Sequence, residues 1–545
     1  MIPNRRLLAP LIVLLAAFWA HGPALDGGLV YDDEPYLTEN SAVSGEASPW
    51  TSPLGDPRQG LWRPITVLSQ RLEWKGSADV RGLHRTNILL HALASLLVLL
   101  LARRLDLDQR ASVVAALLFA VHPVHAESVA WITGRAELLA TLFVLVAWCA
   151  HLGEGRRSAI LSMVALALAG LSKENALAAP ALFLVGDLAR QRLRLGRLAA
   201  LGAACVGLFL ARLSVLPSLL PMEGPFTDVP LAGRAVVALN ILGRAVGLLA
   251  WPAPLRIEYQ RQEFLLFQLG PALAAAVLIG LIVWCWPRWR SLALGLVAVP
   301  IAMIPVLNLV PIGESFAERF LYLPSVGFCL AAGAALSALA SREQRSGRGL
   351  GPSLAILLVA VGLALPTTRA ATKVFHDDLS LWRHAARVAP DLPLTRYNHG
   401  AFLDRAGRHL SEDRDNPGCI EELRASLELD PGHIYAGFAH QILGTHALGQ
   451  QGTPGPANAW LAAEHFRSAS ELLPGLVEPR LNLATIAAAS PDVVDPSEAL
   501  QLLAPLSGIP DLPAEQRLAV QELVRQLAGG SSPPQTTGTS SPDGS

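Results

Sequence analysis

Long apolar runs alternate with short polar joints over the first part of the chain, from about residue 5 to residue 366. A helix needs about 20 apolar residues to cross a bilayer, and fewer where it ends in a polar cavity. The pattern predicts eleven membrane spans, near 7–25, 85–102, 111–124, 129–152, 158–171, 174–188, 198–215, 268–286, 291–310, 320–340 and 350–367. The first span is expected to stay uncleaved, because no clear small-residue cleavage site follows it.

The placement of basic residues predicts the orientation of these spans. They form six groups: Arg5/Arg6, Arg103/Arg104/Arg110, Arg156/Arg157, Arg190/Arg192/Arg194/Arg197, Arg288/Arg290 and Arg342/Arg345/Arg348. Cytoplasmic loops hold the excess of Lys and Arg. Eleven spans place all six groups inside, provided that a further apolar stretch, 233–251, does not cross. The N-terminus is then inside, and the C-terminal region is outside.

The stretch 233–251 carries Arg234, Asn240 and Arg244. Charges at bilayer depth are costly unless they face a cavity. We therefore expect this stretch to be re-entrant or interfacial on the outer side. An ordinary span with snorkelling arginines is the alternative reading.

From residue 373 onward the chain has the composition of a soluble protein. Three segments share a short amphipathic helix closed by proline: 380–390, 421–431 and 464–474. A second helix-like stretch follows each of them: 396–408, 436–448 and 480–489. This pattern resembles tetratricopeptide repeats, with insertions in the loops. The helical stretch 497–528 would cap the stack, and the Gly/Ser/Pro/Thr tail 529–545 is predicted to be disordered.

Composition supports one membrane region and one soluble region. The chain is 52% hydrophobic and only 16% charged, whereas soluble domains contain about 25% charged residues. A net charge of -1 gives no reason to expect a nucleic-acid partner. The five cysteines include no C-x-x-C pair, so neither a disulfide framework nor a zinc site is expected.

The predicted outer joints carry the unusual polar residues. The long first loop, 26–84, contains Tyr31-Asp32-Asp33-Glu34, which could be a solvated turn or part of a site. The next joint and the helix after it contain His122, His125, Glu127, Arg135 and Glu137. Its histidines could bind a metal, but more often such side chains cap helices or hydrogen-bond a neighbour.

Two further outer joints combine cations with acids. Lys173 and Glu174 lie between two short apolar runs, and they could form a buried salt bridge or a pocket for an anionic head group. Glu314, Glu318 and Arg319 lie at the start of the tenth span. Arginine suits phosphate because its planar fork binds oxygens in pairs, and a carboxylate suits deprotonation of a hydroxyl. This layout is typical of an enzyme that acts on a lipid-phosphate substrate at the membrane surface.

Several stretches, in one order, resemble the transmembrane and tetratricopeptide-repeat O-mannosyltransferases, which are GT-C type glycosyltransferases. They are Tyr31-Asp32-Asp33-Glu34, Trp62-Arg63-Pro64-Ile65, 83–91, 122–130, 134–140, 172–175 and 317–329. The resemblance implies an all-α chain: a membrane domain at 1–370, a tetratricopeptide-repeat solenoid at 371–528 and a tail at 529–545. It implies inverting transfer of mannose or a similar hexose from a polyprenyl-phosphate donor to a protein hydroxyl, with the acceptor peptide held by the repeats.

The resemblance also implies roles for particular residues. Asp32 or Asp33 would act as the base, with Asp32 slightly favoured. The donor phosphate would meet Lys173, Arg244 and Arg319. The residues expected to shape the site are Glu127, Arg135, Glu137, His122, His125, Glu174 and Glu318. No metal ligand is assigned, and a divalent metal is not expected.

Two departures leave the sugar and the acceptor open. The chain has three repeats where eukaryotic members carry many more, and Thr227-Asp228-Val229-Pro230 stands where Asp-Asn-Pro is expected. A membrane-anchored repeat scaffold without catalysis remains an alternative, as does an undecaprenyl-linked glycan ligase or polymerase. A transporter is disfavoured because the charges gather at one face rather than at the midplane. The expected location is a bacterial inner membrane, with the repeats outside the cytoplasm.

Overall fold

The structure is a computed structural model that describes residues 5–54, 61–74, 80–216, 224–346, 351–410, 417–449, 456–509 and 512–529. It divides into two compact units, Met1–Val388 and Ala389–Ser545. All regular elements in the described ranges are helical. The tail predicted to be disordered, beyond Gly529, lies outside these ranges.

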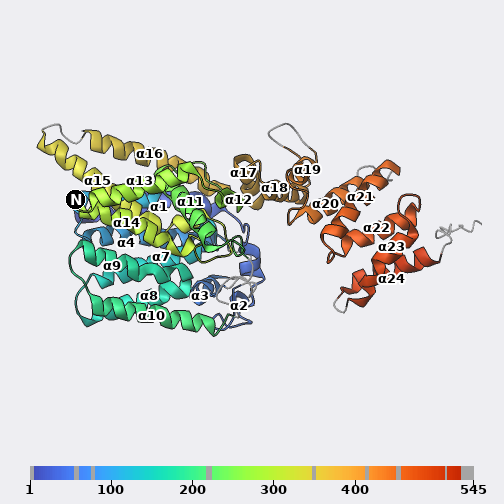
Figure 1. Ribbon diagram of the computed structural model, residues 1–545, viewed down its shortest axis with the longest axis horizontal. Coiled ribbons are helices and arrows are strands. Elements are labelled where there is room, and N and C mark those ends of the chain that lie inside the picture. The colour runs from blue at the N-terminus through green and yellow to red at the C-terminus, as the bar shows by residue number, and fades with distance from the viewer. Residues whose placement is uncertain are drawn as a thin grey trace, which may run out of the picture. The chain divides into compact units, whose positions relative to one another are not determined.

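The first unit is a bundle of long helices that run side by side (Figure 1). Its main helices are α1 (Arg5–His21), α4 (Val80–Arg104), α5 (Gln109–Val121), α7 (Arg135–His151), α8 (Gly155–Ser172), α9 (Ala179–Ala189), α10 (Leu195–Leu213), α11 (Leu231–Ala250), α13 (Leu269–Cys285), α14 (Arg290–Met303), α15 (Pro324–Arg345) and α16 (Gly351–Val374). A helix lies at each of the eleven predicted spans. Six helices of the described chain are long and apolar enough to cross a membrane, or seven if α5 and α6 (Ala126–Ala130) form one bent span. The count of eleven crossings stays a prediction.

The rim of this bundle leaves large apolar side chains exposed. On α13, Leu273 and Val277 are 55% and 59% exposed, and on α16 Leu358 and Val359 are 62% and 60% exposed. Water would disfavour such continuous apolar faces, whereas lipid tails solvate them. Together with the apolar helices, this pattern indicates an integral membrane protein.

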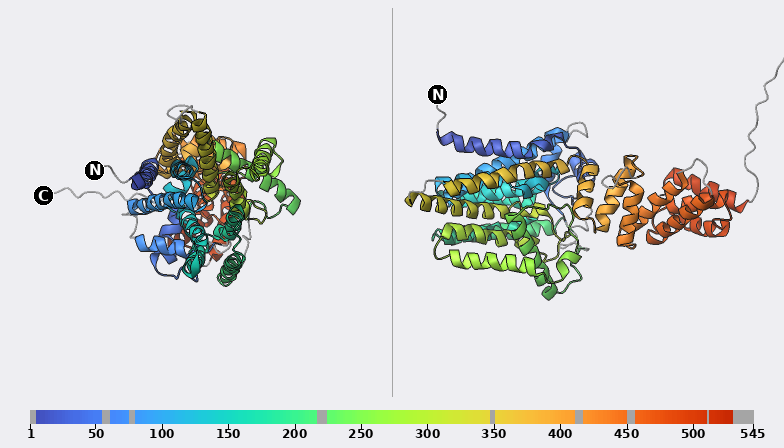
Figure 2. Two further views of the ribbon diagram at one scale, coloured as in Figure 1. Left: turned by 90° about the vertical axis from the view of Figure 1, so that its left-hand side faces the viewer. Right: turned by 90° about the horizontal axis from the view of Figure 1, so that it is seen from above.

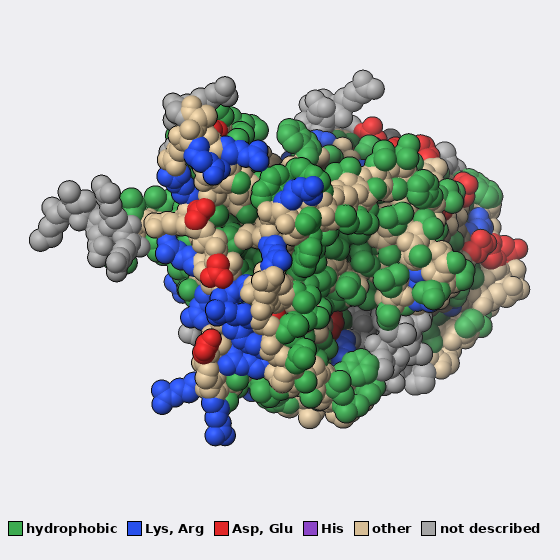
Figure 3. All heavy atoms as spheres, turned by 60° about the vertical axis from the view of Figure 1, so that its left-hand side comes forward, with side chains coloured by type: hydrophobic (Ala, Val, Ile, Leu, Met, Phe, Trp, Pro, Cys, Tyr) green, Lys and Arg blue, Asp and Glu red, His purple; other side chains and the backbone are tan. Residues whose placement is uncertain are grey.

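The basic groups gather at one end of the bundle (Figure 3). Arg110 donates to Gln344 at 3.0 Å, which joins the start of α5 to the end of α15. Arg190, after α9, pairs with Asp106 at 2.8 Å. The guanidinium of Arg342 lies over the Trp289 ring, between α13 and α14. The helix ends predicted to share one side of the membrane therefore share one end of the bundle.

Helix α11 is a continuous helix rather than a re-entrant break, and by length and composition it could cross a membrane. Its contacts nevertheless lie at the end opposite the basic groups. Arg234 donates to the Leu309 carbonyl, Asn240 to the carbonyls of Phe264 and Leu266, and His122 approaches the Leu249 carbonyl at 3.0 Å. Both ends of α11 thus contact outer joints, an arrangement that favours the interfacial reading over a crossing.

The second unit is a series of shorter helices (Figure 2). They are α18 (Pro393–Arg405), α19 (Cys419–Leu429), α20 (Ala436–Gly449), α21 (Pro456–Leu472), α22 (Glu478–Ala489), α23 (Pro496–Leu503) and α24 (Ala514–Ala528). Successive helices pack through small and apolar residues, with Gly444 of α20 directly against the Phe466 ring of α21. The helices coincide with the predicted repeat segments, and their assignment as tetratricopeptide repeats stays a prediction.

One predicted repeat helix packs in the first unit instead. Helix α17 (Asp378–Val388) corresponds to the predicted segment 380–390. The Asp378 carboxylate accepts from the Tyr31 backbone N–H at 2.8 Å, and His384 approaches the Leu255 carbonyl at 3.1 Å. The compact boundary therefore follows Val388, whereas sequence analysis began the repeat domain at residue 371.

Candidate active site

The acidic stretch of the first loop is held in a strained turn. Tyr31 has a φ of 56°, in the left-handed region that a bulky residue rarely adopts. Its hydroxyl donates to Glu258 at 2.9 Å, and its ring lies 5.6 Å from both Trp131 and Trp382. Such strain persists only where surrounding contacts fix the conformation, and it is common at functional sites. These contacts fix the backbone that carries Asp32 and Asp33.

Asp33 is fully buried, and its carboxylate is occupied by hydrogen bonds. It accepts from the Val30 N–H at 3.1 Å and from the N–H and hydroxyl of Thr133 at 2.9 and 2.6 Å. Burial raises the pKa of Asp33 to about 7, although these hydrogen bonds oppose the rise. The side chain therefore ties the first loop to the loop before α7, and its geometry leaves little access for a substrate hydroxyl.

Asp32 is half-buried and is the available one of the two neighbouring aspartates. Within the described ranges, its carboxylate has no hydrogen-bond or ion-pair partner. Burial raises the pKa of Asp32 to about 6, with the positive charge of Arg319 opposing the rise and Glu314 adding to it. Asp32 is thus mostly ionised at neutral pH and free to accept a proton.

Arg319 anchors the acids beside Asp32. It lies on η8 (Glu318–Leu321), donates to Glu127 through Nη1 at 2.5 Å, and donates to Glu314 through Nη2 at 2.7 Å. Its backbone N–H also donates to Glu127 at 2.7 Å. Its guanidinium lies 5.0 Å from the Trp131 ring centre. Arg319 is therefore paired with two carboxylates while its charge still acts on Asp32.

A second charged cluster surrounds the joint between α8 and η6 (Glu174–Ala178). Lys173 donates to Glu137 of α7, and Asn175 donates to the same carboxylate at 3.2 Å. Glu174 receives both arms of Arg63, at 3.1 and 2.7 Å. Lys173 and Glu174 are thus both ion-paired, but with other residues rather than with each other.

Glu174 is held ionised in this cluster. Burial opposes ionisation, yet Arg63, followed by Arg212 and Lys173, keeps the pKa of Glu174 well below its ordinary value. The Arg212 guanidinium lies 3.7 Å from the Glu174 carboxylate. Three cations therefore surround the paired acids of this joint.

The three predicted phosphate partners are only partly brought together. Lys173 and Arg319 both lie over the Phe320 ring, at 5.3 and 5.4 Å from its centre. Arg244 lies 3.6 Å from Glu263 and 5.9 Å from the Tyr259 ring, and the Tyr259 hydroxyl donates to Glu318 at 2.7 Å. Lys173 and Arg319 therefore contact the same ring, whereas Arg244 contacts different residues, Glu263 and Tyr259.

Three residues expected to shape the site serve the surrounding framework. His122 approaches the Leu249 carbonyl at 3.0 Å, and His125 pairs with Ser325 at 2.8 Å. Arg135 is fully buried and binds Asn87, Glu73 and the carbonyls of Ser69 and Leu83. Hydrogen bonding to neighbours, rather than the metal-binding reading, fits the two histidines.

The sequence pattern assigned no individual role to Arg63, Arg212 or Glu258. Arg63 lies in the Trp62-Arg63-Pro64 motif, directly before α3 (Pro64–Glu73). Arg212 is a cation in the last turn of α10, at the end predicted to face outward, where the charge rule predicts few basic residues. That exception was the available signal for Arg212. No local sequence pattern indicates that Glu258 accepts a hydrogen bond from the distant Tyr31.

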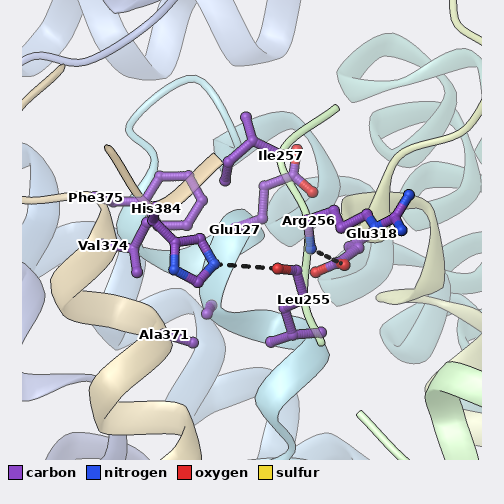
Figure 4. Close-up of a pocket in the computed structure, with 10 residues that line it drawn as sticks. Glu127, Leu255, Arg256, Ile257, Glu318, Ala371, Val374, Phe375 and His384 are labelled. Atoms are coloured by element: carbon purple, nitrogen blue, oxygen red, sulfur yellow. Dashed lines mark hydrogen bonds between the residues drawn. The ribbon is translucent and has the colours of Figure 1, made fainter. Parts of the chain in front are cut away.

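Glu318 lines a small pocket beside the acids (Figure 4). The pocket has a volume of about 20 Å³, which suits roughly one water molecule rather than a sugar. One Glu318 oxygen accepts from the Arg256 N–H at 2.6 Å and from the Tyr259 hydroxyl at 2.7 Å. Burial raises the pKa of Glu318 to about 8, so its other oxygen carries a proton at neutral pH.

This protonation predicts a benign Glu318→Gln substitution. The amide keeps the accepting oxygen, so we expect unfolding stability at pH 7 to change by less than about 1 kcal/mol, whereas Glu318→Ala costs about 1–3 kcal/mol by leaving buried donors unpaired. A raised native pKa means that the native state binds the extra proton, so wild type loses stability as the pH rises from about 5 to about 8. The Gln variant should lose less unfolding stability than wild type over this pH range. Thermal unfolding in detergent across this range measures both effects, and equal losses for Gln and Ala would contradict them.

Several known proteins are similar in sequence to this chain. Protein O-mannosyl-transferase Tmtc1 of Drosophila melanogaster is 28% identical over 535 residues, covering 76% of this chain and 60% of that protein. Protein O-mannosyl-transferase TMTC4 of Homo sapiens is 30% identical over 495 residues, covering 74% and 65%. TMTC3 of Mus musculus is 29% identical over 380 residues, covering 58% and 40%. The alignments thus span less than two thirds of each of these relatives.

No family model matches the chain. A crystal structure of the Archaeoglobus fulgidus oligosaccharyltransferase in the apo form aligns with a TM-score of 0.44 and 16% identity, over 73% of this chain and 59% of that one. Similarity at this level does not establish a common fold. The resemblance that the motifs predicted is confirmed by the sequence relatives: this chain is a homologue of the transmembrane and tetratricopeptide-repeat protein O-mannosyl-transferases.

Proposed function

We propose that this chain is a membrane glycosyltransferase that moves mannose or a similar hexose from a polyprenyl-phosphate donor to a protein hydroxyl. The reaction takes place at the end of the bundle that carries Asp32, opposite the basic groups. In a bacterium this end faces the outer side of the inner membrane. The names of the sequence relatives support the reaction class.

The observation that carries the proposal is the state of Asp32. It is half-buried, unpaired within the described ranges and ionised near neutral pH, and it is held on a strained turn near the charges of Arg319 and Glu314. A general base must have an accessible, unprotonated oxygen close to the reacting hydroxyl. Asp32 meets this requirement, and Asp33 does not.

The cations around the α8–η6 joint supply the second requirement. Transfer releases a lipid phosphate, and its developing charge needs preorganised positive groups. Lys173, Arg63 and Arg212 converge on paired acids there, and the charge of Arg319 reaches Lys173. We assign the donor phosphate to this cluster, with Lys173 and Arg319 as its primary partners. Arg244 has a supporting role through Tyr259.

In this mechanism Asp32 takes the proton of the acceptor hydroxyl as its oxygen attacks the anomeric carbon. The bond from that carbon to the phosphate oxygen breaks, its electron pair stays on the phosphate, and the configuration inverts. Glu127 and Glu314 hold Arg319 in place, and Glu137 and Glu174 do the same for Lys173 and Arg63. The chain's own side chains supply both the base and the charge for the leaving group.

Purified full-length chain in detergent, given a radiolabelled short-chain polyprenyl-phosphate mannose and a Ser/Thr-rich peptide, is expected to transfer label to the peptide. A polyprenyl-phosphate glucose donor tests which hexose is used. Release of the labelled sugar from the peptide by β-elimination would identify a Ser/Thr linkage. Absence of transfer with every donor and peptide would overturn the proposal in favour of the non-catalytic scaffold.

A further inference from the structure

Four side chains of metal-ligand type converge in the second unit, away from the candidate active site. Each offers one ligand atom, and these atoms all lie within 4.8 Å of one another. They come from α18, from the connection after it, from α19 and from α20: Asp404, His409, Cys419 and His446. The cysteine is fully buried, and the other three are half-buried or exposed.

We propose that these four residues form a zinc site. Zinc in proteins is bound by four ligands in a tetrahedron, with Zn–S near 2.3 Å and Zn–N near 2.0 Å, which separates neighbouring ligand atoms by about 3.3–3.5 Å. The Cys419 sulfur lies 3.5 Å from His446 Nε2 and 3.8 Å from His409 Nδ1. Asp404 Oδ1 lies 3.5 Å from His409 Nδ1. Three ligand separations therefore already have nearly the spacing of a tetrahedral zinc site.

Hydrogen bonding alone explains this cluster less well. A single nitrogen, His446 Nε2, faces both the Cys419 sulfur and Asp404 Oδ1, the latter at 2.5 Å. An N–H has one proton and can point it at one of these acceptors only. A metal ion among the four atoms, which all lie within 4.8 Å of one another, would bind all of them together once Asp404 Oδ1 and His446 Nε2 move apart to the ligand spacing.

A cysteine–histidine–aspartate nucleophile is the competing chemistry, and the geometry disfavours it. In such a triad the acid binds one imidazole nitrogen while the other contacts the nucleophile. Here Cys419 and Asp404 meet the same nitrogen of His446. The Cys419 side chain is also fully buried, so no substrate reaches its sulfur.

The donor set selects zinc among divalent ions. One thiolate and two imidazoles exclude calcium and magnesium, which take oxygen ligands. One thiolate, two imidazoles and one carboxylate in a tetrahedral arrangement suit zinc. The bound ion would tie α18 to α19 and α20, so it would stabilise the start of the repeat unit. The ligands lie far apart in the sequence, which explains why their spacing did not predict the site.

The test is metal binding by full-length chain in detergent, stripped with EDTA and dialysed. Zinc titrated against a chromophoric chelator is expected to bind at one equivalent per chain and to raise the thermal unfolding temperature. Cobalt in place of zinc should give a sulfur-to-cobalt charge-transfer band. Failure to bind zinc, or cobalt binding without that band, would overturn the proposal.

Two variants assign the site. Cys419→Ser should abolish the charge-transfer band and weaken zinc binding by about 100-fold or more, beyond the ~10–100-fold cost of losing an outer-shell partner. His409→Ala, at a side chain that is 43% exposed, gives the same weakening with little risk to folding. His465→Ala is the matched control, because His465 pairs with His440 at 2.8 Å in the same unit without a cysteine. Unchanged zinc affinity in both test variants would overturn the assignment, and sugar transfer does not enter the measurement.

Discussion

Replacing Asp32 with asparagine is expected to lower sugar transfer by about 10²–10⁴-fold, the range that a positioned general base contributes. The amide has the same shape as the carboxylate but accepts no proton at neutral pH. Because the wild-type carboxylate is unpaired within the described ranges, the substitution breaks no hydrogen bond or ion pair described there. Transfer assays with matched amounts of folded protein, judged by thermal unfolding, measure the loss.

Asp33→Asn is the matched control, the same substitution one residue away. Its amide would face the Val30 N–H, which now donates to a carboxylate oxygen at 3.1 Å. We expect a stability loss of about 1–3 kcal/mol, with transfer per folded molecule nearly unchanged. If Asp33→Asn abolished transfer while Asp32→Asn did not, the base would be Asp33 and the assignment would be wrong.

The pH dependence of transfer gives an independent check on Asp32. A base works only when ionised, and burial raises the pKa of Asp32 to about 6. Transfer by wild type should therefore rise with pH through about 6 and level off above it. If the transfer rate did not fall as the pH is lowered from 8 to 5, a different group would remove the proton.

The helices were largely predictable because lipid imposes a simple rule on the sequence. Each span must be an apolar run of limited length, so α4, α13 and α16 can be recognised directly from the chain. Where the rule is ambiguous, contacts decide: α11 is as apolar as a span, but its hydrogen bonds join it to outer joints. The sequence pattern grouped α17 with the repeats, but an amphipathic pattern does not identify the surface on which a helix packs, and α17 contacts residues of the first unit.

The site was predictable as a set of loops but not as a set of pairs. Asp32, Lys173 and Arg319 lie in polar joints that are evident between apolar runs, and the resemblance to the O-mannosyltransferases implied their roles. The sequence does not show that Thr133 occupies Asp33 or that Arg63 reaches Glu174, since these contacts join residues about a hundred positions apart. The difference in surroundings between the two neighbouring aspartates therefore emerged only from the folded chain.

Lys173→Met is expected to impair both folding and transfer, and a double variant separates the two effects. The single change leaves Glu137, only 2% exposed, without its cation, which costs about 3–5 kcal/mol for a buried pair. Lys173→Met with Glu137→Gln removes both charges and keeps the amide of Asn175 paired with the remaining oxygen. Most of the lost stability should return, because an uncharged replacement for a buried ion pair is often neutral.

Transfer in the double variant then decides what Lys173 does. If the Lys173 ammonium stabilises the leaving phosphate, sugar transfer by the folded double variant should remain about 10²–10³-fold slower than by wild type. That is the cost of removing one preorganised charge donor. Glu137→Gln alone leaves Lys173 in place but without its carboxylate, so we expect a stability loss similar to that of Lys173→Met, with transfer per folded molecule reduced less than in the double variant. If the double variant transfers sugar as fast as wild type, Lys173 and Glu137 form only a buried salt bridge. The donor phosphate would then belong with Arg319 and Arg63.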